Sequence, residues 1–166
     1  NFDELISSTL DLSGITSNPG VTLSFRYAYR KRQSGNNEWL KVKISKDCGD
    51  SWVTRKTLYG SILGADISSS NWTPSESDWV TIHMTNITST YWTNNFKYKF
   101  EFESDGGNNL YIDDINIYPG SPSDNLISGV EEQLALGHQK IERHPPLTTD
   151  SALFSNPIDD DAHQLS

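Results

Sequence analysis

Three segments of this chain alternate apolar and polar residues with a period of two, the spacing at which side chains of a β-strand share a face. They cover residues 21–30, 38–45 and 95–103. The apolar rows are Val21, Leu23, Phe25, Tyr27, Tyr29, Leu40, Val42, Ile44, Phe96, Tyr98, Phe100 and Phe102. Shorter candidate strands cover 4–10, 52–58 and 79–84, and helical spacing is nearly absent before residue 120. With a last strand near 110–118, the pattern predicts an all-β fold, a two-sheet antiparallel β-sandwich.

The last strand changes phase. Its apolar residues fall on even positions at 110 and 112 and on odd positions at 115 and 117. A strand has a strict period of two, so an extra residue, a β-bulge, is predicted near Asp113 and Asp114. The two adjacent carboxylates allow two interpretations: a solvated, bulged edge, or part of an oxygen-ligand site for calcium.

Length and charge favour one folded domain followed by a segment of another kind. The chain has 166 residues, 34% of them hydrophobic, which suffices for one core. Residues 1–118 carry 14 acidic and 11 basic side chains, whereas 119–166 carry 8 and 2. The sequence after Tyr118 begins Pro-Gly-Ser-Pro-Ser, a linker composition. We predict a β-sandwich over residues 1–131 and an irregular acidic C-terminal tail over 132–166.

Composition also limits the partners. A net charge of −9 argues against nucleic acid, because neutralising phosphates requires concentrated Lys and Arg. No stretch approaches the roughly 20 apolar residues of a membrane span. The single cysteine, Cys48, excludes an internal disulfide framework and a cysteine-based zinc site, and it is compatible with export. The abrupt start at Asn1 indicates a cut rather than a natural terminus.

Catalytic motifs are missing from the sequence. The histidines are His83, His138, His144 and His163, and no two have a metal-ligand spacing. No Ser-His-Asp arrangement, phosphate loop or dinucleotide fingerprint occurs. The sequence therefore predicts a domain that is not an enzyme.

The stretch from Ser45 to Trp52 follows the pattern Ser-x-Asp-x-Gly-x-Ser-Trp, which resembles the Asp-box of secreted β-proteins. In that motif Asp47 would bond the backbone of a turn, Gly49 would supply a positive φ and Trp52 would pack beneath the hairpin. This structural role is favoured over a surface contact with a glycan.

The outward rows suggest two binding surfaces. The basic residues in these rows are Arg26, Arg30, Lys41, Lys43, Lys97 and Lys99. They form either a solvated sheet face, the favoured interpretation, or a positive stripe for an acidic polysaccharide. The aromatic residues outside the clear inward rows are Trp39, Trp72, Trp79, Tyr91 and Trp92. Trp72 and Trp92 lie in polar connections, where binding residues often sit, and are the predicted ligand-binding residues.

A structural calcium site is a further prediction. Calcium takes six to eight oxygen ligands, usually a mixture of carboxylates and carbonyls. Asp113 and Asp114 at the bulge, with Asp3 and Glu4 near the first strand, would supply four carboxylates if the two strand ends met. Without a cation, their mutual repulsion would destabilise the fold.

Several motifs in combination resemble one family. These are Asp3-Glu-Leu-Ile-Ser7, Leu10-Asp-Leu-Ser13, Leu23-Ser-Phe-Arg-Tyr-Ala-Tyr29, Trp39-Leu-Lys-Val-Lys-Ile-Ser-Lys-Asp-Cys-Gly49 and Gly106-Gly-Asn-Asn-Leu-Tyr-Ile-Asp-Asp-Ile115. They resemble a MAM-like jelly-roll domain that follows the catalytic domain of secreted cytophagalysin-type metallopeptidases and occurs in other Bacteroidetes surface proteins. The resemblance covers about residues 3–131. It implies a non-catalytic sandwich, often with structural calcium, and transfers no protease site, because the sequence contains no His-Glu-x-x-His.

Two features depart from that family. Members have another strand before the Asp-Glu-Leu-Ile-Ser motif, so the sandwich is expected either to lack its first strand or to receive it from elsewhere. In the tail, Leu153-Phe-Ser-Asn-Pro-Ile-Asp159 weakly resembles the opening of a type IX secretion sorting domain, with Ser155 in place of the first proline.

The expected function is that of an accessory or binding module of a larger secreted or cell-surface bacterial protein, such as a metallopeptidase. Its expected partners are neighbouring domains of the same polypeptide and an extracellular glycan or protein. The alternative is a carbohydrate-binding module of a glycan-degrading or adhesive surface protein.

Overall fold

The structure is a computed structural model, and it describes residues 1–16 and 20–123. The chain divides into two compact units, Asn1–Glu132 and Gln133–Ser166. The second unit, and with it the predicted tail, the sorting-domain resemblance and three of the four histidines, lies outside the described residues.

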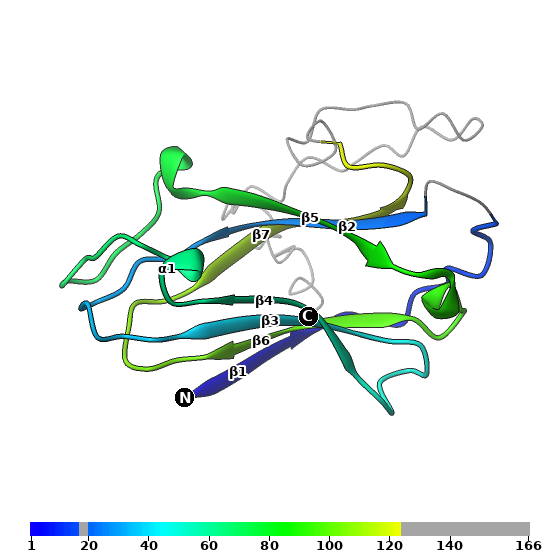
Figure 1. Cartoon of the computed structure of the whole chain (residues 1–166), viewed down its shortest axis with the longest axis horizontal. Helices are drawn as coiled ribbons and strands as arrows, with labels where there is room; N and C mark the ends of the chain where they lie inside the picture. The colour runs from blue at the N-terminus through cyan, green and yellow to red at the C-terminus, as the bar shows by residue number, and fades with distance from the viewer. Residues whose placement is uncertain (17–19, 124–166) are drawn as a thin grey trace, which may run out of the picture. The chain divides into compact units, whose positions relative to one another are not determined.

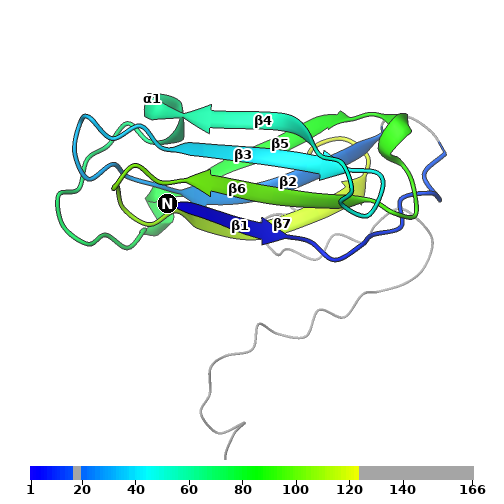
Figure 2. The same cartoon turned by 90° about the horizontal axis from the view of Figure 1, so that it is seen from below.

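The first unit is built from two antiparallel sheets that face each other (Figures 1 and 2). The four-stranded sheet has the order β1-β6-β3-β4 and contains β1 (Phe2–Ile6), β3 (Trp39–Ser45), β4 (Val53–Tyr59) and β6 (Lys97–Glu103). The three-stranded sheet has the order β5-β2-β7 and contains β2 (Val21–Ala28), β5 (Val80–Ile87) and β7 (Tyr111–Pro119). Short helices occupy the connections: α1 (Gly60–Leu63), η1 (Glu76–Asp78) and η2 (Ser89–Tyr91). The predicted all-β sandwich is confirmed.

The core lies between the sheets and is made by the predicted inward rows. Every apolar residue of the row from Val21 to Tyr29 is at most 6% exposed, and Leu40, Val42 and Ile44 are fully buried. Phe25 of β2 meets Phe100 of β6 edge to face, with ring centroids 4.9 Å apart. Since burying one such side chain contributes about 1.5–3 kcal/mol, this double row is the main source of stability.

The outer face of β2 differs from the prediction of a half-buried strand. Thr22, Ser24 and Ala28 are fully buried although they point away from the core. The Thr22 hydroxyl donates a hydrogen bond to the Gly120 carbonyl at 2.6 Å, and the Ser24 hydroxyl lies 3.0 Å from the Tyr118 hydroxyl. Strand β2 is the middle strand of its sheet. It is covered on both faces, because side chains of both neighbouring strands and the chain after β7 contact its outer face.

The predicted bulge in β7 is present. The pairing of β2 with β7 matches Ser24 to Asn116 and Arg26 to Asp113, so Asp114 and Ile115 together oppose Phe25. Asp114 has a φ of 49°, the left-handed conformation that one residue of such a bulge adopts. The extra residue lets Ile112 and Ile115 both pack against the core.

Candidate functional site

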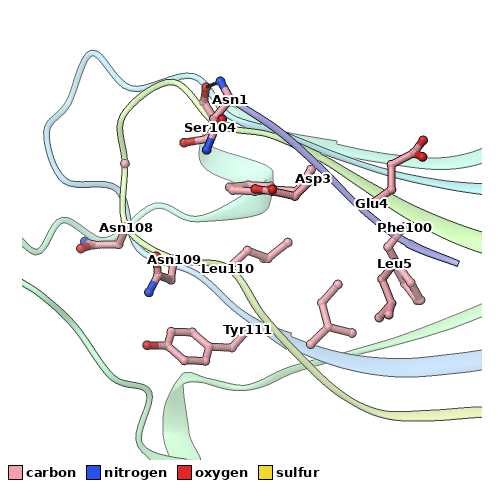
Figure 3. Close-up of a pocket in the computed structure, with 13 residues that line it drawn as sticks. Asn1, Asp3, Glu4, Leu5, Phe100, Ser104, Asn108, Asn109, Leu110 and Tyr111 are labelled. Carbon is pink, nitrogen blue, oxygen red and sulfur yellow. Dashed lines mark hydrogen bonds between the residues drawn. The ribbon is translucent and has the colours of Figure 1, made fainter.

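An open groove runs along the edge of the sandwich between β1 and the start of β7 (Figure 3). Its volume is about 510 Å³, and its apolar lining includes Leu5, Phe102, Leu110 and Ile112. Leu5 faces the space between the sheets, because it pairs with buried Phe100, yet it is 50% exposed. The sandwich is therefore not closed at this edge.

Strand β1 is exposed along its whole length. It pairs with β6 on one side, and all five of its residues are exposed. Phe2 and Ile6 are 56% and 48% exposed on the outer face of the sheet. An edge strand with uncovered apolar side chains is a template for association, which soluble proteins normally blunt with charges or a covering segment.

A row of three aromatic side chains, interrupted by Glu103, crosses the outer face of the four-stranded sheet. Phe2 of β1 and Trp39 of β3 both pair with Glu103 of β6, and Trp39 pairs in turn with Tyr59 of β4. Residues directly opposite each other share a face, so the four side chains line up across the sheet. The rings of Trp39 and Tyr59 stack with centroids 4.6 Å apart, and Tyr59 is 46% exposed.

The positive stripe, the alternative to a solvated sheet face, is not formed. Arg26 belongs to β2 and Arg30 follows it, so both lie with the three-stranded sheet, whereas the lysines belong to the other sheet. Five of the six cations also have acidic partners. The ion pairs are Arg26 with Glu76 and Asp114, Arg30 with Asp66 and Asp78, Lys41 with Glu103, Lys43 with Glu101, and Lys99 with Glu4 and Glu101. The outer faces of the sheets therefore carry mixed charges and no continuous basic surface.

The four predicted calcium ligands lie on two different sheets. Asp3 and Glu4 are in β1, and Asp113 and Asp114 are in β7. Glu4 pairs with Lys99 of β6 at 2.6 Å, whereas Asp114 lies 3.5 Å from Arg26 of β2, the neighbouring strand in its own sheet. Among residues 1–16 and 20–123, no three His, Cys, Asp or Glu side chains stand close enough to hold a metal ion. Calcium at these four residues stays a prediction.

The two predicted ligand-binding tryptophans make packing contacts. Trp92 donates its indole N–H to the Ile87 carbonyl at 3.0 Å and packs against the core. Trp72 meets Tyr111 edge to face at 5.9 Å, with the Arg30 guanidinium 5.3 Å from its ring centroid. Both side chains are partly exposed. Their role in ligand binding stays a prediction.

The turn between β3 and β4 has the hydrogen bonds expected from its motif. The Asp47 carboxylate accepts the Ser51 N–H at 3.0 Å and the Ser45 hydroxyl at 2.6 Å, together with the Ser51 hydroxyl. These bonds, with the one from Ser45 first, lower the pKa of Asp47 to about 2. Gly49 has a φ of 101°, and a side-chain Cβ there would lie 3.2 Å from the Trp52 ring. The motif shapes the turn.

One buried acid was missed by the sequence reasoning. Glu38 precedes β3, is 1% exposed, and neither of its carboxylate oxygens has a hydrogen-bond partner among the described residues. The signal was available, because position 38 falls in the inward row with 40, 42 and 44. An acid in an apolar row is unusual and points to a specific local partner.

His83 is also placed by the structure. Its Nδ1 lies 2.7 Å from the Ser24 hydroxyl on the outer face of the three-stranded sheet. No helix among the described residues is long and apolar enough to span a membrane.

Comparisons of the chain with protein-family models, curated proteins and solved structures found no match.

Proposed function

We propose that this sandwich is a non-catalytic accessory module of a larger secreted or cell-surface bacterial protein, such as a metallopeptidase. The observation that carries the proposal is the exposed strand β1, whose Phe2, Leu5 and Ile6 are 56%, 50% and 48% exposed. Exposed apolar side chains in an edge strand that is paired on one side only favour a covering partner. The partner that fits is a neighbouring domain of the same polypeptide.

The aromatic row strengthens this proposal because it continues the apolar surface from β1 onto the sheet face. Phe2 belongs to both, and Tyr59 ends the row on the far edge strand, β4. Interfaces between domains combine such aromatic anchors with polar rims. Here Glu103, between Phe2 and Trp39, and Lys41, which lies 3.9 Å from it, supply the charges.

A carbohydrate-binding module is the second candidate, favoured by the same aromatic row, since aromatic rings stack on sugar rings. The ring of Trp39 already stacks on Tyr59, and the Lys41 ammonium lies 5.5 Å from its centroid. This leaves the half-exposed Tyr59 as the more accessible ring of the pair. The stacked pair therefore offers a glycan less ring surface than two separate aromatics would.

The two functions separate in one experiment. Unfolding of the longer polypeptide is followed for the parent, for Phe2→Ser/Ile6→Ser, and for Ile62→Ser, which changes an apolar side chain that is 61% exposed in α1. If the sandwich is an accessory module, its unfolding should no longer be coupled to that of the neighbouring domain in Phe2→Ser/Ile6→Ser. The coupling should persist in Ile62→Ser. Binding of the parent to a glycan array, lost in Tyr59→Ala and kept in Trp72→Ala, would instead favour the carbohydrate-binding module.

A further inference from the structure

Two polar side chains on the outer face of β2 are fully buried although the core lies on the other face. Thr22 and Ser24 are both 0% exposed. A buried hydroxyl destabilises the fold unless it is hydrogen-bonded. The Thr22 hydroxyl donates to the Gly120 carbonyl at 2.6 Å, and the Ser24 hydroxyl lies 3.0 Å from that of Tyr118. Both buried hydroxyls therefore bond to the end of β7 or to the chain that follows it.

A turn after β7 brings the chain back over β2. Gly120 has a φ of 112°, in the left-handed region that favours glycine. Its N–H donates to the carbonyl of Gly20, the residue before β2, at 2.8 Å. Further on, the Ser123 N–H donates to the Tyr118 hydroxyl at 3.0 Å. The stretch 119–123 is thus held at both ends, although its composition predicts a linker.

The bonds around Tyr118 continue across the sheet to His83. His83 Nδ1 lies 2.7 Å from the Ser24 hydroxyl. Every hydroxyl hydrogen is used once if Tyr118 donates to Ser24 and Ser24 donates to His83 Nδ1, while the Tyr118 oxygen accepts the Ser123 N–H. Connected hydrogen bonds of this kind strengthen one another in a buried setting. The exit of the chain from β7 is therefore tied to all three strands of its sheet.

We propose that Thr22, Ser24 and Tyr118 form a clasp that holds residues 119–123 on the outer face of β2 and makes the junction with the following polypeptide rigid. A linker rich in Gly and Ser would otherwise move independently of the sandwich. The clasp fixes the point at which the chain leaves the sandwich, which suits a module that positions a neighbour. It uses no residue of β1, so it goes beyond the proposed function and is tested separately from it.

NMR relaxation and amide exchange of the whole chain test the clasp. In the parent, the backbone order parameters of Gly120, Ser121 and Ser123 should be close to about 0.85, the value of a rigid backbone. In the double variant Thr22→Val/Tyr118→Phe they should fall below about 0.6. The Ser123 amide should exchange about fivefold faster or more in Tyr118→Phe, because its acceptor is gone.

Tyr27→Phe and Thr57→Val are the matched controls. Tyr27 also donates its hydroxyl to a carbonyl, that of Ile62 at 3.1 Å, but it belongs to the inner row of β2. Thr57 lies in β4, in the other sheet. Tyr27→Phe should lower the melting temperature, because it loses a hydrogen bond as Tyr118→Phe does, yet both controls should keep the order parameters of residues 120–123 at the parent values. This separates the clasp from a general loss of stability.

Two results would overturn the proposal. The first is a parent whose order parameters at residues 120–123 are already below about 0.6, which is the behaviour of a free linker. The second is a folded double variant in which these order parameters are unchanged, which would mean that the hydroxyl bonds do not hold the segment. Should the double variant fail to fold, the single variants Thr22→Val and Tyr118→Phe decide by the same measurement.

Discussion

Lys99 Nζ lies 2.8 Å from Glu101 Oε2, and the two side chains are 10% and 7% exposed on the outer face of the four-stranded sheet. Lys43 approaches Glu101 at 2.7 Å, and Glu4 approaches Lys99 at 2.6 Å. The Trp52 ring covers the Lys99 ammonium, 4.8 Å from the ring centroid. Alternating charges on three neighbouring strands thereby join β1 to the centre of the sheet.

Glu101→Gln should weaken this network more than Glu4→Gln does. The first change removes the charge between two ammonium groups where water has little access, and we expect a loss of about 2–3 kcal/mol in the free energy of unfolding. Glu4 is 31% exposed, so its loss should cost less than about 1 kcal/mol. Urea unfolding of both variants measures the difference. Equal losses in the free energy of unfolding would show that burial does not determine how much each ion pair contributes.

Acid should destabilise the sandwich partly through Asp47. Hydrogen bonds lower the pKa of this carboxyl from 3.8 to about 2 in the folded chain. The contribution is present above the unfolded pKa and is lost as the pH falls from about 4 toward 2. Asp47→Asn should therefore show a smaller drop in melting temperature over this range than the parent. Circular dichroism at several pH values tests this, and parallel curves would refute it.

The bulge should tolerate glycine and reject a β-branched residue at position 114. Asp114 has a φ of 49°, which Gly adopts freely and Val does not. Asp114→Gly should be close to neutral, because the relief of strain at a positive φ offsets the lost contact with Arg26. Asp114→Val should cost about 1–3 kcal/mol. Chemical denaturation of the two variants distinguishes them, and a neutral Val variant would contradict the observed backbone.

Gly107→Ala should disturb the packing of Tyr29 and Glu38, whereas Gly35→Ala should not. A Cβ at Gly107 would overlap the Tyr29 hydroxyl at 2.2 Å, but a Cβ at Gly35 would meet nothing within 4 Å. We expect the first variant to melt at a clearly lower temperature and the second to match the parent. Differential scanning calorimetry makes the comparison. If Gly107→Ala melts as the parent does, the space beside Glu38 is less confined than the structure indicates.

The sequence predicted well the features that depend on local periodicity. The inward rows of β2, β3 and β6 follow from alternation, and the change of phase around Asp113 and Asp114 located the bulge before any strand pairing was known. Both are properties of a single strand with a fixed side-chain period.

The features that depend on which strands are neighbours could not be predicted in this way. Arg26 and Lys43 were candidates for one stripe, but they lie in different sheets. Gly107 approaches the buried Glu38 side chain although it is far away in sequence, so only the folded structure reveals this contact. The exposure of β1 likewise depends on its edge position beside β6.

Hydrogen exchange of strand β1 tests the proposed accessory role most directly. Amide exchange of residues Phe2–Ile6 is compared between this chain alone and the longer polypeptide. Coverage by a neighbouring domain should slow exchange in β1 by at least about tenfold while leaving β5, the edge strand of the other sheet, unchanged. Equal exchange rates for β1 in both contexts would contradict the proposal that this edge carries the function of the module.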